Sequence, residues 1–148
     1  LAPVLRALGI QVLVHDPYLT QPADGVTAVD LATLLRKADH VICLARHSAE
    51  TENMVDARFL AQMKPSAFFI NASRGALVDE RALAAALTSG HLAGAAIDVG
   101  RAHDDQPTLD LARQPGEACR FAQRGEPACR APRADGRVRE HAQGQYSG

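Results

Sequence analysis

Short apolar runs alternate with single amphipathic segments over the first hundred residues, and this alternation restricts the fold more than any other feature of the chain. The apolar runs are predicted strands, at Gln11–Val14, His40–Ala45, Ala67–Asn71 and Leu92–Val99. Strands that alternate with single helices require right-handed crossovers, which favour a parallel sheet covered by helices. We therefore predict an α/β fold with a doubly wound parallel sheet.

The helical segments between these strands have recognisable starts and ends. Asp30, Asp56 and Asp79 each precede a helical pattern and have the carboxylate that an N-cap favours. Gly90 follows the last pattern and predicts the end of that helix. A further short helix is predicted at Pro3–Leu8. The apolar side chains expected to face the sheet are Leu31, Leu34, Leu35, Ala38, Phe59, Leu60, Met63, Leu83 and Leu87.

The alternating pattern fades from about residue 106, and residues 113–148 have a different composition. This segment contains seven arginines, four acidic residues and few large apolar side chains. Such a segment buries too little apolar surface to offset the entropy that it loses on ordering. We predict one domain at residues 1–112, followed by an irregular or disordered basic tail at residues 113–148.

Charge, hydropathy and cysteine content argue against several classes of protein. The net charge of -1 provides no general attraction to nucleic acid. No apolar run approaches the ~20 residues that a membrane-spanning helix needs. The three cysteines form neither a disulfide framework nor the spacing of a zinc site, so we expect no metal. We expect a cytoplasmic protein without nucleic-acid or membrane partners.

The residues after the third predicted strand include the groups best suited to chemistry. Asn71, Ser73 and Arg74 directly follow a wholly apolar run and precede a helix start. Ligands of open parallel sheets bind just beyond the carboxyl ends of the strands, and an arginine there can hold a carboxylate in a bidentate fork. The alternative is that Asn71 and Ser73 only cap a turn while Arg74 points into water.

The order and content of these segments resemble the nucleotide-binding domain of the D-isomer-specific 2-hydroxyacid dehydrogenases, which include phosphoglycerate, glycerate and formate dehydrogenases. The resemblance covers residues 1–99 and extends more loosely to 111. It implies a Rossmann-like fold and NAD-dependent hydride transfer between a small 2-hydroxy acid and its 2-oxo acid. The matching pieces are His15–Tyr18, Ser48–Thr51, Asn53–Val55, Asn71–Gly75, Val78–Asp79 and Gly94–Val99.

The same resemblance implies roles for individual residues. Arg74 is expected to be the catalytic arginine, which holds the substrate carboxylate and polarises the C2 oxygen. Arg46 and His47 stand where the family often has a proline-containing stretch. The residues expected to bind the cofactor are Asp16, Thr51, Ala72, Ser73 and Asp98.

Two of these cofactor residues are strand-terminal aspartates with an alternative interpretation. Asp16 is expected to accept hydrogen bonds from the adenosine ribose, which favours NAD over NADP. It could instead bond to the backbone of its own Asp-Pro turn. Asp98 is expected to hold the nicotinamide carboxamide, because an acid at the end of a buried strand needs a partner. Its alternatives are a helix N-cap or a salt bridge to a helix.

Several elements of the family pattern do not occur in these 148 residues. They contain no Gly-x-Gly-x-x-Gly loop and no Pro-His dipeptide for a catalytic base, and neither His103 nor His141 has a suitable context. The first strand of a doubly wound sheet is central, so its absence leaves two strand edges unpaired. We expect a truncated, inactive fragment that folds poorly alone or forms a homo-oligomer. The alternative is a non-catalytic binding or assembly module derived from such an enzyme.

Overall fold

The computed structural model describes residues 1–101, 108, 111 and 119–121. The strands are β1 (Leu13–Val14), β2 (Thr27–Ala28), β3 (His40–Cys43), β4 (Phe68–Asn71), β5 (Gly94–Ile97) and β6 (Cys119–Phe121). The helical elements are α1 (Ala2–Ala7), α2 (Leu31–Lys37), α3 (Ala57–Gln62), the 3₁₀ turn η1 (Gly75–Leu77) and α4 (Glu80–Thr88).

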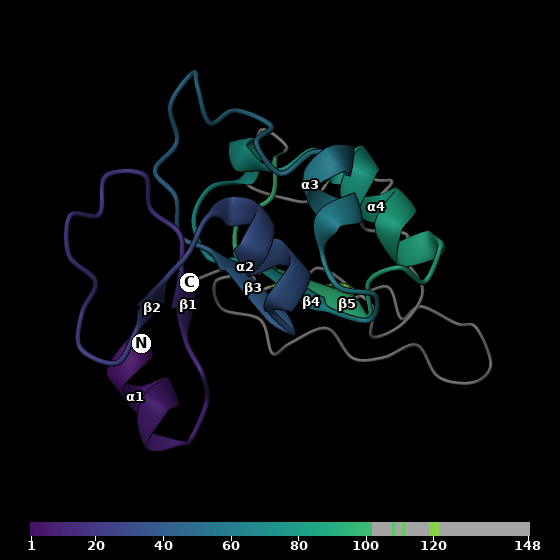
Figure 1. The fold of residues 1–148 in the computed structure, drawn as a ribbon. Helices are drawn as coiled ribbons and strands as arrows, with labels where there is room; N and C mark the ends of the chain where they lie inside the picture. Colours follow the sequence, from purple (N-terminus) through teal and green to yellow (C-terminus); the bar gives the residue numbers. More distant parts are fainter. Residues whose placement is uncertain (102–107, 109–110, 112–118, 122–148) are drawn as a thin grey trace, which may run out of the picture.

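The strands form two parallel sheets with a break between them. β1 pairs with β2, whereas β3, β4, β5 and β6 form a four-stranded sheet in that order. Helices α2, α3 and α4 lie next to the larger sheet, and α1 lies apart from them beside β1 (Figure 1). The break between β1 and β3 falls where the predicted doubly wound sheet has its central first strand. The structure thus confirms the parallel α/β prediction.

Aspartate caps begin the three central helices, as the sequence predicts. An Oδ1 atom of Asp30 accepts a hydrogen bond from the Thr33 amide at 2.8 Å, and Asp56 caps α3 in the same way at 2.8 Å. Asp79 accepts two bonds, of 3.0 and 3.2 Å, from the first turn of α4. Gly90 follows α4 with a φ of 72°, which an L side chain adopts only at a cost. These contacts confirm the predicted helix boundaries.

The buried core lies entirely beyond residue 30. Among the described residues, the first buried side chain in the sequence is Leu35, and none of residues 1–30 is buried. Phe69 is fully buried in β4 and meets the ring of Phe59 edge-on, with 6.3 Å between the ring centroids. Leu111, one residue before the predicted domain end at 112, is also fully buried.

The predicted strands are each shorter in the structure, and three short elements have no predicted counterpart. β2 and η1 were not predicted, because two or three residues are too few for a periodic pattern. β6 lies within residues 113–148, where we expected an irregular tail, and pairs in parallel with β5. The remainder of that predicted tail lies outside the described residues. In the described part of the chain, no helix is long and apolar enough to cross a membrane.

Candidate functional site

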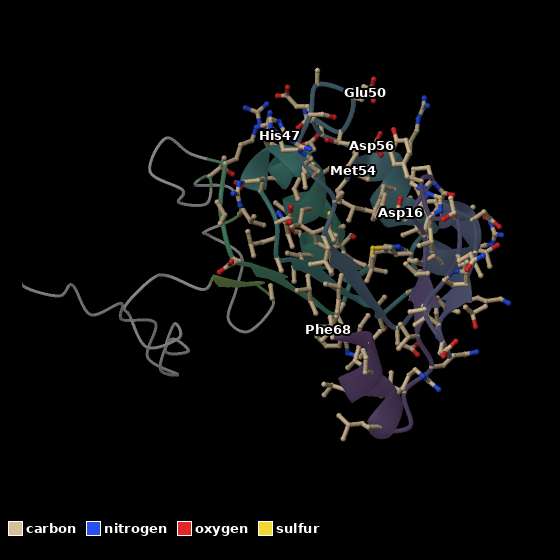
Figure 2. The ribbon with its side chains drawn as sticks, turned by 90° about the vertical axis from the view of Figure 1, so that its left-hand side faces the viewer. Asp16, His47, Glu50, Met54, Asp56 and Phe68 are labelled. Carbon is tan, nitrogen blue, oxygen red and sulfur yellow. The ribbon has the colours of Figure 1, made fainter. Side chains whose placement is uncertain are left out.

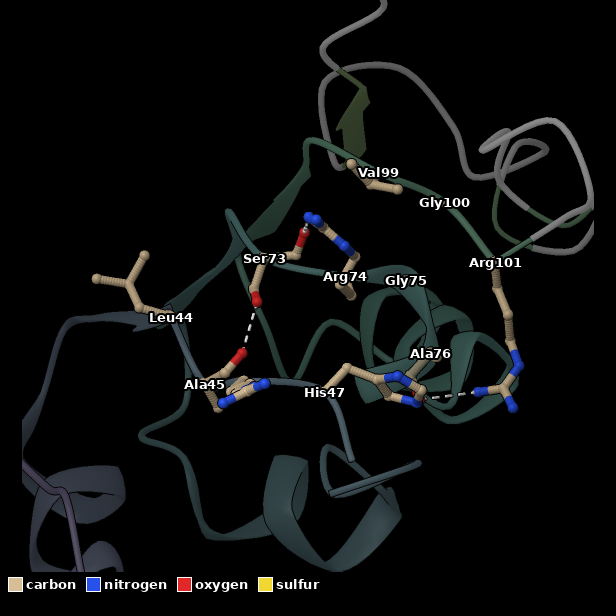
Figure 3. A pocket seen from close by; sticks show the side chains of 11 residues that line it. Leu44, Ala45, His47, Ser73, Arg74, Gly75, Ala76, Val99, Gly100 and Arg101 are labelled. Atoms are coloured by element: carbon tan, nitrogen blue, oxygen red, sulfur yellow. Dashed lines mark hydrogen bonds between the residues drawn. The ribbon is translucent and has the colours of Figure 1, made fainter. Parts of the chain in front are cut away.

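A pocket of about 610 Å³ opens at the carboxyl ends of three neighbouring strands, β3, β4 and β5 (Figure 3). Open parallel sheets bind their ligands at this edge. Loops from each of the three strands line it: Leu44, Ala45, Arg46, His47, Ser73, Arg74, Gly75, Ala76, Val99, Gly100 and Arg101. The predicted residues Ser73 and Arg74 are among them.

Asn71 fixes the loop that bears Arg74. It ends β4 between Cys43 of β3 and Ile97 of β5, and its side chain is only 1% exposed. Its amide Nδ2 donates to the Arg74 carbonyl at 2.9 Å, and its Oδ1 accepts from the Ser73 amide at 3.1 Å. Because both ends of the buried amide are satisfied, it holds the loop in one conformation.

The Ser73 hydroxyl joins the loops after β3 and β4. Its Oγ donates to the Ala45 carbonyl at 2.5 Å (Figure 3), and the neighbouring Ala72 amide donates to the Cys43 carbonyl at 3.3 Å. The single hydroxyl proton is therefore used inside the protein. In this structure Ser73 positions the pocket wall, and Ala72 is exposed beside it.

Arg74 is exposed, and its side chain lines the pocket (Figure 3). Its Nη1 donates to the Ser73 carbonyl at 3.0 Å. Among the described residues it has no carboxylate partner, and its other guanidinium donors remain available to a ligand. Such a group can accept the carboxylate of a ligand.

Gly75 lets the loops after β4 and β5 touch. A Cβ added at Gly75 would overlap the Gly100 carbonyl and lie 2.7 Å from the Arg101 backbone nitrogen. Only glycine permits this approach, because a backbone neighbour cannot rotate away as a flexible side chain can. The contact brings Gly100 against the start of η1 and closes one side of the pocket.

Arg101 and Glu80 hold the loop after β5, and the sequence did not predict either role. The Arg101 guanidinium forms an ion pair with Glu52 at 2.9 Å and also donates to the Asn53 side chain and the Ala76 carbonyl. Glu80 is only 4% exposed, and its carboxylate accepts the backbone amides of Arg101 at 2.8 Å and Thr108 at 2.6 Å. The positive charge of Arg101 is thus already matched by a carboxylate.

Four of the five predicted cofactor residues do not line the pocket: Asp16, Thr51, Ala72 and Asp98. Asp16 follows β1, is exposed, and accepts the Tyr18 amide at 2.9 Å, which is the Asp-Pro turn considered as its alternative. In Figure 2, Asp16 and His47 lie on opposite sides of the view, and both are above Phe68 at the start of β4. The cofactor-binding roles of these predicted residues stay predictions.

Thr51, Asp98 and the exposed Ala72 are the other three predicted cofactor residues outside the pocket lining. The Thr51 hydroxyl donates to the Arg46 carbonyl at 2.9 Å and accepts the Ser48 amide at 2.8 Å, so it organises the loop after β3. Asp98 follows β5 and is exposed. The expectation that burial would demand a partner for its carboxylate is therefore wrong, because solvent reaches that side chain.

Arginines determine the electrostatics of the pocket. Arg46, Arg74 and Arg101 line it together with His47, and no Asp or Glu among the described residues does. The sequence pattern predicts no role for Arg46 or His47, although both come directly after an apolar strand. Beneath this loop, burial raises the pKa of the Cys43 thiol and keeps it protonated. Within the described residues, no cluster of ligands could hold a metal ion.

Comparison with known proteins agrees with this architecture. Residues 1–116 match the family model of the D-isomer specific 2-hydroxyacid dehydrogenase, NAD binding domain. A (S)-sulfolactate dehydrogenase from Chromohalobacter salexigens is 47% identical over 105 residues, covering 67% of this chain and 33% of the relative. A D-3-phosphoglycerate dehydrogenase from Synechocystis sp. is 43% identical over 101 residues, covering 66% of this chain and 18% of the relative.

Solved structures show the same fold. An NAD-dependent formate dehydrogenase from Staphylococcus aureus in complex with NAD superposes with a TM-score of 0.74 at 27% identity, covering 81% of this chain and 36% of that chain. A glyoxylate reductase from Paecilomyes thermophila gives a TM-score of 0.73 at 30% identity, covering 81% and 36%. The chain spans a third or less of the length of the two enzymes compared by sequence. It belongs to the D-isomer specific 2-hydroxyacid dehydrogenase family, through the sequence of the NAD-binding domain.

Proposed function

We propose that this chain is the NAD-binding part of an oxidoreductase that transfers hydride between a small 2-hydroxy acid and NAD. The observation that supports this most is the position of Arg74, at the pocket edge of a parallel sheet and held by the buried Asn71. The sulfolactate, phosphoglycerate and glycerate dehydrogenases among its relatives are named for 2-hydroxy acids. The substrate proposed here has the same functional group.

The described residues fit one side of a dinucleotide. Asp16 uses only Oδ1 in its turn, and within the described residues Oδ2 accepts no hydrogen bond, so it can accept ribose hydroxyls. We assign the nicotinamide side to Thr51, Ala72, Ser73 and Asp98. NAD, when bound, supplies the hydride acceptor. We assign no diphosphate contact, because residues 1–148 contain no Gly-x-Gly-x-x-Gly segment.

Arg74 then binds and orients the substrate, which is the step that this chain contributes. Its guanidinium binds the substrate carboxylate through two parallel hydrogen bonds and places the C2 oxygen near the same positive charge. Asn71 and Ser73 keep the loop in place, so that little ordering is required when the substrate binds. The proton acceptor for the C2 hydroxyl is not assigned to a described residue.

The test compares Arg74→Gln with Arg58→Gln, a control that removes the same charge from the exposed face of α3. Binding of NADH is followed by its fluorescence, and binding of 2-hydroxy acids by calorimetry. We expect Arg74→Gln to retain NADH affinity within about twofold and to lose at least about tenfold in affinity for the acid. Equal acid affinity in both variants would contradict the assignment of Arg74.

A non-catalytic assembly module, including a homo-oligomer, is the second candidate. The break between β1 and β3 leaves strand edges without partners in the described residues. On α1 and its flanks, Leu1, Val4 and Leu8 are 67%, 63% and 71% exposed. If the chain is an assembly module, it should associate with itself in sedimentation and should not bind NADH. The enzyme proposal requires NADH binding. We place either form in the reducing cytoplasm, where the buried Cys43 stays a thiol.

A further inference from the structure

We propose that Arg46 is a specificity-determining residue that binds a second anionic group on the substrate, beside the carboxylate that Arg74 binds. The substrate class is therefore a small 2-hydroxy acid that also has a sulfonate, phosphate or second carboxylate. This inference rests on the proposed function, because it uses the position of Arg74 as the carboxylate site. No other residue of the pocket is required for it.

The strand register places the two arginines at equivalent positions. Cys43 of β3 is paired with Asn71 of β4, and Arg46 and Arg74 each follow these partners by three residues. Neighbouring parallel strands are ~4.8 Å apart. The Ser73 hydroxyl donates to the Ala45 carbonyl, so the loops after β3 and β4 are still adjacent one residue before each arginine. Both side chains line the same pocket.

The charges of the pocket leave these two arginines without carboxylate partners. Arg101 is matched by Glu52, but within the described residues neither Arg46 nor Arg74 forms an ion pair. In the part of the chain that the structure describes, no acidic side chain lines the pocket. Two positive charges on adjacent loops repel each other. A ligand with two anionic groups relieves this repulsion, whereas a ligand with one anionic group leaves one arginine without a partner.

The backbone that bears Arg46 is held in place. The Thr51 hydroxyl donates to the Arg46 carbonyl at 2.9 Å and thereby closes the loop after β3. Ala45, immediately before it, accepts the Ser73 hydroxyl. Arg46 is thus an exposed side chain on a fixed backbone, which suits a group that must reach an entering ligand.

The experiment measures the affinity of the full chain, in the presence of NADH, for two matched acids. These are 2-hydroxy-3-sulfopropanoate and lactate, which share the three-carbon 2-hydroxy acid and differ in the sulfonate. Calorimetry compares the unchanged protein with Arg46→Gln, Arg46→Lys, Arg74→Gln and the control Arg58→Gln. Thermal melting and NADH fluorescence are recorded for each protein.

We expect the unchanged protein to bind the sulfonated acid at least about tenfold more tightly than lactate. Arg46→Gln should remove this preference without changing lactate affinity, Arg46→Lys should keep part of it, and Arg58→Gln should keep all of it. Arg74→Gln should weaken both acids.

Other outcomes separate the two proposals. Equal binding of the two acids, or equal loss of both in Arg46→Gln, would overturn the role of Arg46 and leave the proposed function standing. A loss of NADH affinity in Arg46→Gln would assign this arginine to the cofactor and also overturn the inference. Failure of the unchanged protein to bind NADH and either acid would reject the proposed function itself, and the inference with it.

Discussion

At the scale of single residues, the pocket depends on a few side chains that fill no part of the apolar core. Asn71 satisfies both of its amide groups inside the loop that bears Arg74, and Ser73 joins that loop to the one after β3. Gly75 contributes by the absence of a side chain. The arginines can act on a ligand only because these neighbours fix their backbone.

Replacement of Gly75 by alanine tests the close approach of the two loops. We expect Gly75→Ala to lower the free energy of unfolding by about 1–3 kcal/mol, because the new Cβ overlaps the Gly100 carbonyl. Urea denaturation gives the difference. Gly90→Ala is the control, because a Cβ there meets nothing within 4 Å and only the left-handed conformation is strained. Its loss should be about 1 kcal/mol, and a loss for Gly75→Ala no larger than this would refute the steric account.

Replacement of Asn71 tests how the Arg74 loop is held. Asn71→Ala leaves the Ser73 amide and the Arg74 carbonyl without their partner, and each lost buried bond costs about 1–3 kcal/mol. We expect the acid affinity to fall together with the stability, because Arg74 is no longer pre-positioned. The measurement combines urea denaturation with calorimetry. Unchanged acid affinity in a folded Asn71→Ala protein would show that this loop needs no support.

At the scale of elements, each central helix begins at an aspartate that the sequence alone identifies. In α2, the side-chain hydroxyl and the backbone amide of Thr33 hydrogen-bond to Asp30 and hold the pKa of that carboxyl below its ordinary value. The short helices have little intrinsic stability, since six to nine residues are below the length at which an isolated helix persists in water. Their caps and their packing on the sheet compensate for this.

The lowered pKa of Asp30 predicts a pH dependence of stability. A carboxyl group whose folded pKa is depressed contributes stability above its unfolded pKa and loses that contribution as the pH falls through the folded pKa. Asp30→Asn keeps a capping oxygen but removes the titration. We expect thermal melting temperatures of the two proteins to agree at neutral pH, and the loss of stability on acidification to be smaller in Asp30→Asn. Parallel melting curves at every pH would contradict this assignment.

At the scale of the whole molecule, the two sheets differ in how well they are buried. Residues 1–30 contribute no buried side chain, although α1, β1 and β2 all lie there. The core is built from α2 onward, around the fully buried Phe69 of β4. The break between β1 and β3 therefore divides a weakly packed part from a well packed one.

This division predicts unequal local stability. We expect amide hydrogen exchange, measured by mass spectrometry on the native protein, to be much faster in residues 1–30 than in residues 67–97. Regions with few buried apolar contacts open with low free energies, whereas core strands open only with global unfolding. Equal protection of the two regions, or one sharp cooperative melt of a monomer, would contradict the weak attachment of β1 and β2.

The sequence by itself determined the parallel α/β architecture, the three aspartate caps and the Asn71–Gly75 loop. These depend on local rules: hydrophobic period, capping chemistry and the direct succession of strand and polar loop. β2 and η1 are too short to show a hydrophobic period, so these rules do not predict them. β6 lies where the composition predicts no regular structure.

Only the tertiary structure decided which side chains meet in the pocket. It placed Arg46 and Arg74 on the lining of one pocket, matched Arg101 with Glu52, and left Asp98 exposed. These relations depend on strand register and on contacts between residues far apart in the chain, such as Arg101 and Glu52. A sequence pattern shows which residues follow a strand. Whether an arginine there is free to bind a ligand depends on whether the fold brings a carboxylate to it.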